Sequence, residues 1–153
     1  MDLKLEVIII PVSDVDRAKK FYEEALGFRV DVDHRAAFYE QALGFRQRGA
    51  ASYRIVQLTP PGSACSIQIG TGITQGTPGA SQGMYLVTSD LEATRAELIA
   101  RGVKVSEPFH FGPEGQTSGL DPKRASYNSY VSFSDPDGNG WLIQEIKQRL
   151  PGR

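Results

Sequence analysis

The stretch Val131–Ile146, VSFSDPDGNGWLIQEI, has the pattern of two short strands joined by a tight turn. In its first four residues, the apolar Val131 and Phe133 alternate with serines, as expected of a strand with one buried face. A second apolar run, Trp141–Ile146, follows. The residues between the two runs, DPDGNG, are strong turn formers. The pattern predicts a hairpin that closes a sheet.

The same turn has features of a calcium-binding loop. Asp135, Asp137 and Asn139 stand at alternate positions, as the first ligands of an EF-hand loop do. The twelfth position of that loop requires a bidentate glutamate, and Ile146 stands there. No helical pattern flanks the turn. We therefore set calcium binding aside and keep the hairpin.

The composition excludes several classes of protein. Seventeen basic and eighteen acidic side chains give a net charge of −1, unlike the strongly basic surface of a protein that binds nucleic acid or anionic membranes. The only cysteine, Cys65, allows no internal disulfide, and no apolar run approaches the length of a membrane span. We expect a cytoplasmic protein with a small-molecule ligand and with neither a nucleic-acid nor a membrane partner.

Two parts of the chain share the order strand, cap and helix. Leu5–Val12 is rich in β-branched residues, and Ser13 is then expected to cap an amphipathic helix that ends at Gly27. Met84–Thr88 is a second predicted strand, followed by a capping box that begins at Ser89. Further strands are predicted at Tyr53–Thr59, Cys65–Ile69, Val103–Ser106, Tyr127–Ser134 and Trp141–Ile146, with a long loop at Phe111–Ser126.

The closing segment SFSDPDGNGWLIQE, together with this order of elements, resembles the vicinal oxygen chelate superfamily, which includes glyoxalases, bleomycin-resistance proteins and extradiol dioxygenases. The resemblance covers nearly the whole chain. It implies an α+β fold in which two βαβββ modules form curved sheets around a cleft. The chain, 1–153, would be a single domain with modules at 1–70 and 84–153 and a linker at 71–83. The resemblance also implies a homodimer.

A tandem repeat departs from the family pattern. Asp16–Arg29 (DRAKKFYEEALGFR) is followed by the near copy Asp33–Arg46 (DHRAAFYEQALGFR), within the segments 16–32 and 33–49. We expect the first copy to form the family's helix and the second to form an additional, partly exposed helix, because Arg35 falls on the face that should be buried. The reverse assignment stays open. A repeat this regular also suggests a scaffold engineered to test a helix duplication.

The residues at the family's metal-binding positions are mostly apolar. In metal-dependent members, His and Glu side chains from both modules hold a divalent ion. The corresponding positions here are Val7, Gly83 and Leu142, which lack ligating side chains, and Gln68. We therefore expect no metal and no other cofactor. Only a shift of register would bring in Gln144 or Glu145, and alternation along a strand places Gln144 better.

Several residues are candidates for a functional site. Histidine is the side chain most often used as a general acid or base, so His110 is the best candidate for that role. Polar and amphipathic side chains on the predicted strands are candidates for a small-molecule pocket, although ordinary sheet packing explains each one taken singly. The candidates for this pocket are Arg54, Gln68, Tyr85, Tyr127, Tyr130, Trp141 and Gln144.

The leading hypothesis is a glyoxalase-like or bleomycin-resistance-like protein that binds a small organic molecule without the usual metal. The alternative is a metal-dependent lyase or dioxygenase with a degenerate site that uses Gln68, His110 and Glu145. Whether the chain is an enzyme, and what it binds, do not follow from the sequence.

Overall fold

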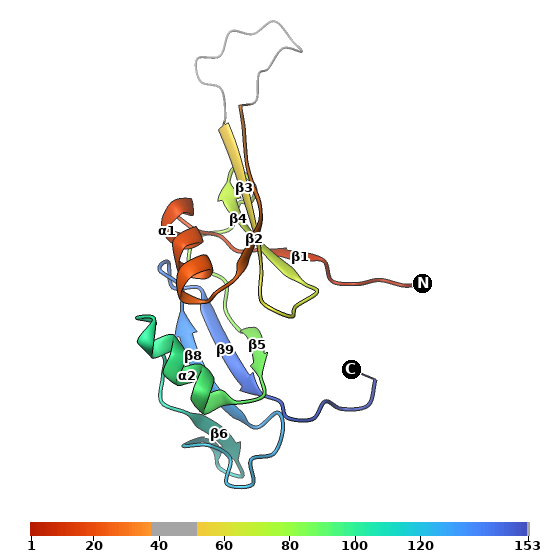
Figure 1. Cartoon of the computed structure of the whole chain (residues 1–153), viewed down its shortest axis with the longest axis vertical. Helices are drawn as coiled ribbons and strands as arrows, with labels where there is room; N and C mark the ends of the chain where they lie inside the picture. Colours follow the sequence, from red (N-terminus) through yellow and green to blue (C-terminus); the bar gives the residue numbers. More distant parts are fainter. Residues whose placement is uncertain (38–51, 153) are drawn as a thin grey trace, which may run out of the picture. The chain divides into compact units, whose positions relative to one another are not determined.

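The computed structural model describes residues 1–37 and 52–152 and divides into two compact units, Met1–Ala80 and Ser81–Arg153 (Figure 1). Each unit has its own mixed sheet and its own α-helix. The described part of the chain holds a four-stranded and a five-stranded sheet, which confirms the predicted α+β fold. None of the helices in the described residues is long and apolar enough to cross a membrane.

The sheet of the first unit has the strand order β1-β4-β3-β2. The outer strand β1 (Val7–Ile9) runs parallel to β4 (Ser66–Thr71). The strand β3 (Ser52–Thr59) is antiparallel to both β4 and β2 (Arg29–Ala37). The parallel pair requires a long crossover connection between β1 and β4, and the helix lies in that connection.

The helical segment of this unit begins as α1 (Val15–Lys20) and continues as a π-helical turn, η1 (Phe21–Ala25), alongside the sheet (Figure 1). It ends at Gly27, whose φ of 72° is in the left-handed region that favours glycine, as predicted. The helical segment contacts β4. The buried apolar side chains here are Ile10, Ala18, Tyr22, Phe28, Val56, Leu58, Ile67 and Ile69.

Both helices are capped by an aspartate one residue after the serine that the sequence favoured. Asp14 has an extended backbone and its Oδ1 accepts from the N–H of Arg17 at 2.9 Å. Asp90 likewise accepts from the N–H of Ala93 at 3.0 Å. A carboxylate also interacts favourably with the positive end of the helix dipole, so an aspartate is well suited to this position.

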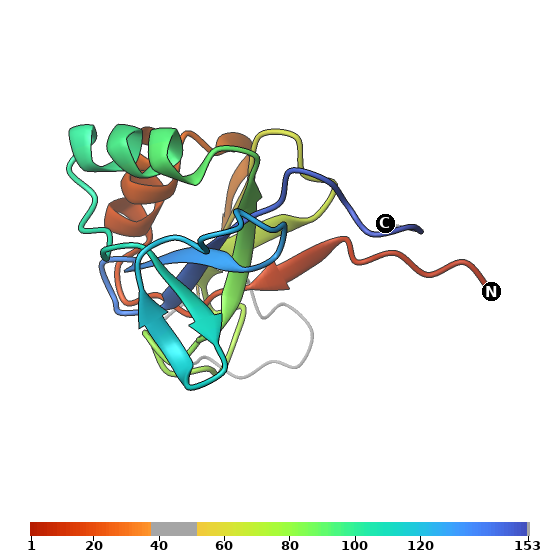
Figure 2. The ribbon, with the colours of Figure 1, turned by 90° about the horizontal axis from the view of Figure 1, so that it is seen from below.

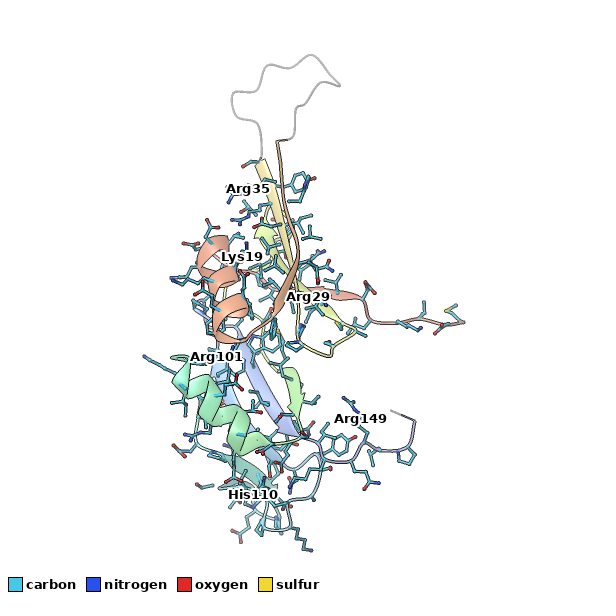
Figure 3. All side chains as sticks on the ribbon, in the orientation of Figure 1. Lys19, Arg29, Arg35, Arg101, His110 and Arg149 are labelled. Carbon is cyan, nitrogen blue, oxygen red and sulfur yellow. The ribbon has the colours of Figure 1, made fainter. Side chains whose placement is uncertain are left out.

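The prediction of a second helix beginning at Asp33 is wrong. Asp33–Ala37 belongs to β2, where Arg35 pairs with Arg54 of the neighbouring strand, and Figure 3 shows Arg35 on this strand. The strand is favoured because Asp33 forms ion pairs with Arg54 at 2.8 Å and Lys19 at 3.1 Å. Residues 38–46, the rest of the second copy, lie outside the described residues.

The sheet of the second unit has the order β5-β9-β8-β6-β7. The helix α2 (Leu91–Ala100) packs on the central strands β8 and β9 (Figure 2). The parallel pair is β5 with β9, and the other neighbours are antiparallel. The strands are β5 (Met84–Thr88), β6 (Phe109–Gly112), β7 (Gly115–Ser118), β8 (Ser129–Ser134) and β9 (Gly140–Glu145).

The predictions for this unit are correct at β5 and wrong between α2 and β8. Val103–Ser106 is not a strand, although Ser106 bonds to Ser132 through its backbone N–H and its hydroxyl, each at 2.9 Å. The first part of the predicted loop, up to Ser118, instead belongs to the β6–β7 hairpin, whereas 119–126 contains no helix or strand, as predicted. All four residues of β7 are exposed, so its sequence lacks the alternation of apolar and polar residues from which strands are predicted.

The DPDGNG segment forms the predicted turn between β8 and β9. Oδ1 of Asp135 accepts from the backbone N–H groups of Asp137 and Asn139, both at 2.9 Å, and its Oδ2 accepts from Asn139 Nδ2 at 2.8 Å. Asn139 Oδ1 in turn accepts from the N–H of Ser81 at 3.1 Å. The alternating polar residues that resembled a calcium loop therefore close the hairpin and attach it to the start of β5.

Candidate functional site

One face of the second sheet differs in burial from the face that α2 covers. Along β9, Trp141, Ile143 and Glu145 are buried, whereas Leu142 and Gln144 are half-buried. Residues paired with Leu142 and Gln144 on the neighbouring strands have their side chains on the same face of the sheet. We call it the open face, and it consists of Tyr85, Val87, Phe109, Phe111, Tyr130, Ser132, Leu142 and Gln144.

The open face carries a cluster of four aromatic rings, and the ring of Tyr130 contacts the other three. The ring of Phe109 stacks on Tyr130 with the centroids 5.6 Å apart, and the Phe111 and Tyr85 rings approach edge-on at 5.5 Å and 6.5 Å. Tyr85 is 55% exposed and Phe111 51% exposed. Large aromatic side chains that stay exposed next to one another are typical of binding surfaces, which makes this cluster a candidate site.

Polar groups beside this cluster are held by the backbone of Tyr127. Its carbonyl oxygen accepts from the hydroxyl of Tyr130 at 2.5 Å and from Nε2 of Gln144 at 2.9 Å. The φ of Tyr127 is 73°, a value that non-glycine residues rarely adopt. This conformation is secured by bonds from the Tyr127 N–H to Glu145 O at 2.8 Å and from the Leu150 N–H to the Tyr127 hydroxyl at 2.9 Å. Tyr127 thus contributes its backbone to the site.

A hollow of about 720 Å³ adjoins the open face. It is lined by Ser132 and Leu142 of that face, by Phe133 and Trp141 of the opposite face, and by Lys104 and Asp135 among others. Its volume is in the range of pockets that accept drug-sized molecules. The hollow thus shares Ser132 and Leu142 with the open face.

The segment before β8 is fastened by an ion pair between Arg124 and Glu145. Glu145 is fully buried, and its carboxylate accepts from Arg124 at 2.7 Å and 3.1 Å and from the N–H of Leu91 at 3.2 Å. The Arg124 guanidinium is the main cause that lowers the pKa of Glu145. Arg124 also donates to Glu92 of α2 at 2.9 Å. Glu145 is thus engaged in structure on the face opposite Gln144.

The first sheet carries a row of polar side chains on the face opposite its apolar core. Nε2 of Gln68 donates to Oε1 of Gln57 at 3.0 Å, and the Gln57 amide reaches the Ser66 hydroxyl at 3.5 Å. Ser66 and Thr59 share a hydrogen bond at 2.6 Å, and Thr59 donates to Asp31. We call these five residues the polar row. Gln68, a predicted ligand-binding residue, belongs to it.

Arg54, another predicted ligand-binding residue, lies on the opposite face, with Val56 and Leu58. Its guanidinium donates to Asp16 at 2.6 Å and to both carboxylate oxygens of Asp33 at 2.9 Å and 2.8 Å. These bonds lower the pKa of Asp33, and Lys19 of α1 lowers it further (Figure 3). Arg54 therefore already links the helix to β2 and β3.

His110 and Trp141 both lie away from the open face. His110, labelled in Figure 3, is nearly buried on β6. It stands between Phe109 and Phe111, whose side chains point to the other face by the alternation of a strand. Its Nδ1 lies 2.8 Å from the carbonyl oxygen of Gly119, so Nδ1 carries the proton. Trp141 is 3% exposed and stacks on Phe133, with centroids 6.2 Å apart.

Sequence reasoning placed Tyr85, Tyr130 and Gln144 among the site candidates and missed Phe109 and Phe111. The alternation of Phe109, His110 and Phe111 is a strand pattern that was available, but the glycine-bearing segment after it favoured a loop. The left-handed backbone of Tyr127 had no signal in the sequence, because glycine or asparagine is the residue expected there.

The residues at the family's metal positions do not fit a metal ion. Val7 and Leu142 offer no donor atom, and Gly83 has no side chain. Within residues 1–37 and 52–152, no group of three or more His, Cys, Asp or Glu side chains is arranged to hold an ion. Of the residues named for a degenerate metal site, Glu145 is engaged by Arg124 and His110 by Gly119.

Comparisons with known proteins agree with this fold. Residues 4–143 match the family model described as Glyoxalase/Bleomycin resistance protein/Dioxygenase superfamily. TnmS3, an antibiotic binding protein from Streptomyces sp. CB03234, is 29% identical over 95% of this chain and 97% of its own, with a TM-score of 0.66. A glyoxalase/bleomycin resistance protein from the same organism is 30% identical over 93% of this chain and 100% of its own, with a TM-score of 0.63.

A third solved structure, a superfamily member from Sphaerobacter thermophilus DSM 20745, is 26% identical over 94% of this chain and 98% of its own, with a TM-score of 0.60. A search of curated proteins finds no match. The family match spans most of the chain. The chain therefore belongs to the Glyoxalase/Bleomycin resistance protein/Dioxygenase superfamily.

Proposed function

We propose that this protein binds a flat, largely apolar organic molecule on the open face of the second sheet, without a metal ion. The observation that carries the proposal is the exposed aromatic cluster around Tyr130, next to a hollow of about 720 Å³. Aromatic rings that remain exposed lose the free energy that burial would supply, about 25 cal/mol for each Å². A planar ligand on Tyr85 and Phe111 recovers part of it.

The chemistry of the open face favours binding over catalysis. Its side chains are aromatic, aliphatic, hydroxyl or amide groups, and none is a carboxylate, an imidazole or an amine, which are the commonest general acids and bases near neutral pH. Lys104 and Asp135 line the adjoining hollow and do not belong to the open face. His110, the predicted acid or base, projects from the other face of β6. The open face is therefore suited to holding a molecule unchanged.

The relatives suggest which class of molecule is held. TnmS3, 29% identical over nearly all of both chains, is described as an antibiotic binding protein. A second relative, 30% identical, is described as a glyoxalase/bleomycin resistance protein. We infer that the ligand of this chain is also an antibiotic-like organic compound, which the protein sequesters.

Calorimetric titration with 2-methoxynaphthalene, a flat ligand with no hydrogen-bond donor, tests this proposal. We expect saturable binding that excess chelator leaves unchanged. Phe111→Ala should weaken binding about fivefold to tenfold, because it removes an exposed ring from the cluster. Ile99→Ala is the matched control, since Ile99 is a 45% exposed apolar residue on α2. Loss of binding on chelation, or equal effects of the two substitutions, would contradict the proposal.

A further inference from the structure

We propose that Gln144 presents a fixed hydrogen-bond acceptor to the ligand, so that the protein selects flat molecules that carry a hydroxyl or N–H group at the ring edge. This inference rests on the proposed function of the open face and adds the polar requirement of the same site. It follows from the hydrogen bonds between Gln144, Tyr130 and Tyr127.

The orientation of the Gln144 amide is determined by its neighbour. Its Nε2 lies 2.9 Å from the carbonyl oxygen of Tyr127, and a carbonyl oxygen only accepts hydrogen bonds. The opposite orientation of the amide would place two acceptors against each other. The amide nitrogen therefore faces Tyr127, and the amide oxygen, Oε1, points elsewhere.

The amide nitrogen of Gln144 faces two oxygens that lie close together. Nε2 donates to the Tyr127 carbonyl oxygen and to the hydroxyl oxygen of Tyr130, each at 2.9 Å. The hydroxyl of Tyr130 donates its single proton to the same carbonyl at 2.5 Å. These bonds hold the nitrogen side of the amide against the protein.

The amide oxygen of Gln144, in contrast, is available. None of the described residues donates a hydrogen bond to it, and no buried side-chain oxygen or nitrogen in this part of the chain lacks a partner. Oε1 is therefore open to solvent, on the half-buried side chain that lies between Val87 of β5 and Tyr130 of β8. Its position beside the cluster is stable because the Tyr127 backbone holds the amide in place.

This arrangement predicts a preference among otherwise similar ligands. A flat molecule that covers the cluster also removes water from Oε1. A ligand hydroxyl or N–H group replaces the lost hydrogen bond, whereas an ether leaves the acceptor unpaired. An unsatisfied buried acceptor weakens binding on the order of tenfold.

The test compares the affinities of 2-naphthol and 2-methoxynaphthalene by calorimetric titration. The wild-type protein should bind 2-naphthol about tenfold more tightly. Gln144→Leu removes the acceptor and should make the two affinities equal within about twofold. Ile99→Ala, on α2, should keep the tenfold preference.

A second variant keeps the test decisive if Gln144→Leu does not fold. Gln144→Met has an unbranched side chain of similar length and also lacks the amide acceptor. The preference for 2-naphthol should fall to about twofold or less in this variant as well. A wild-type protein that binds both ligands equally, or a preference that survives Gln144→Leu, overturns this inference and leaves the aromatic site standing. If neither ligand binds, the proposed function fails as well.

Discussion

The two sheets of this protein share a plan and differ in the side chains that they carry opposite their helices. Each unit pairs its first strand in parallel with a later one, β1 with β4 and β5 with β9, and each begins its helix with an aspartate cap. The first sheet then carries the polar row, whose members bond to one another. The second carries the aromatic open face. The shared plan sets the fold, and the side chains on these faces set the chemistry.

The polar row and the open face also differ in how many of their side chains already have partners within the protein. In the polar row, hydrogen bonds run from Gln68 through Gln57, Ser66 and Thr59 to Asp31. On the open face, Tyr85 and Phe111 are about half exposed, and the amide oxygen of Gln144 is free to accept. A group that already has its partners gains little from a ligand. This difference is why we assign the ligand to the second unit.

The largest expected effect concerns the ion pair that supports the open face. Arg124→Ala leaves the buried carboxylate of Glu145 without its main partner, which should lower the free energy of unfolding by about 3 kcal/mol. Urea unfolding followed by Trp141 fluorescence measures it. Glu92→Gln, at the exposed end of the same network, should cost less than about 1 kcal/mol. Equal effects would mean that Glu145 does not depend on Arg124.

A smaller effect is expected from acid in the first unit. The pKa of Asp33 is lowered below its ordinary value of 3.8, chiefly by Arg54. Its ion pairs therefore stabilise the protein above about pH 4, and this contribution is lost as the pH falls and the carboxyl takes up a proton. Asp33→Asn should reduce stability at pH 7 by about 1 kcal/mol and flatten its decline between pH 4 and pH 2, both measured by urea unfolding. An unchanged decline would show that other carboxylates cause it.

The smallest expected effect concerns the polar row. Gln68→Leu removes the amide that donates to Gln57, which should lower the free energy of unfolding by about 0.5 kcal/mol. Gln57 remains half-buried and keeps its contact with Ser66, so the loss should be limited. Thermal unfolding of the variant measures it. A gain in stability would show that the row is kept at a cost, as a binding surface would be, and would weaken the contrast between the two units.

An element was predicted correctly from the sequence where its local pattern and its packing in the folded protein favour the same secondary structure. Met84–Thr88 was predicted with its observed bounds, because its residues are strand formers and a cap follows. The helix caps were displaced by one residue, because in each Ser–Asp pair both side chains can cap and only the backbone conformation decides. At Asp33, ion pairing across the sheet outweighed the helical pattern copied from the first repeat.

The candidate site was predictable only in part. Tyr85 and Gln144 were identified as polar or amphipathic residues on strands, and the register of β5 with β9 places them on one face. The contribution of Tyr127 comes from its backbone in a left-handed conformation, which depends on contacts with Glu145 and Leu150 that are remote in sequence. No local pattern reports contacts of this kind.

The most direct test of the central claim is a map of backbone amide chemical shifts during titration with 2-naphthol. If the open face is the binding site, the largest changes should occur at Tyr85, Phe111, Tyr130 and Gln144, with β3 and β4 of the first sheet little affected. Changes centred on Gln57 and Gln68, or spread without focus over both sheets, would contradict the assignment of the ligand to the aromatic face.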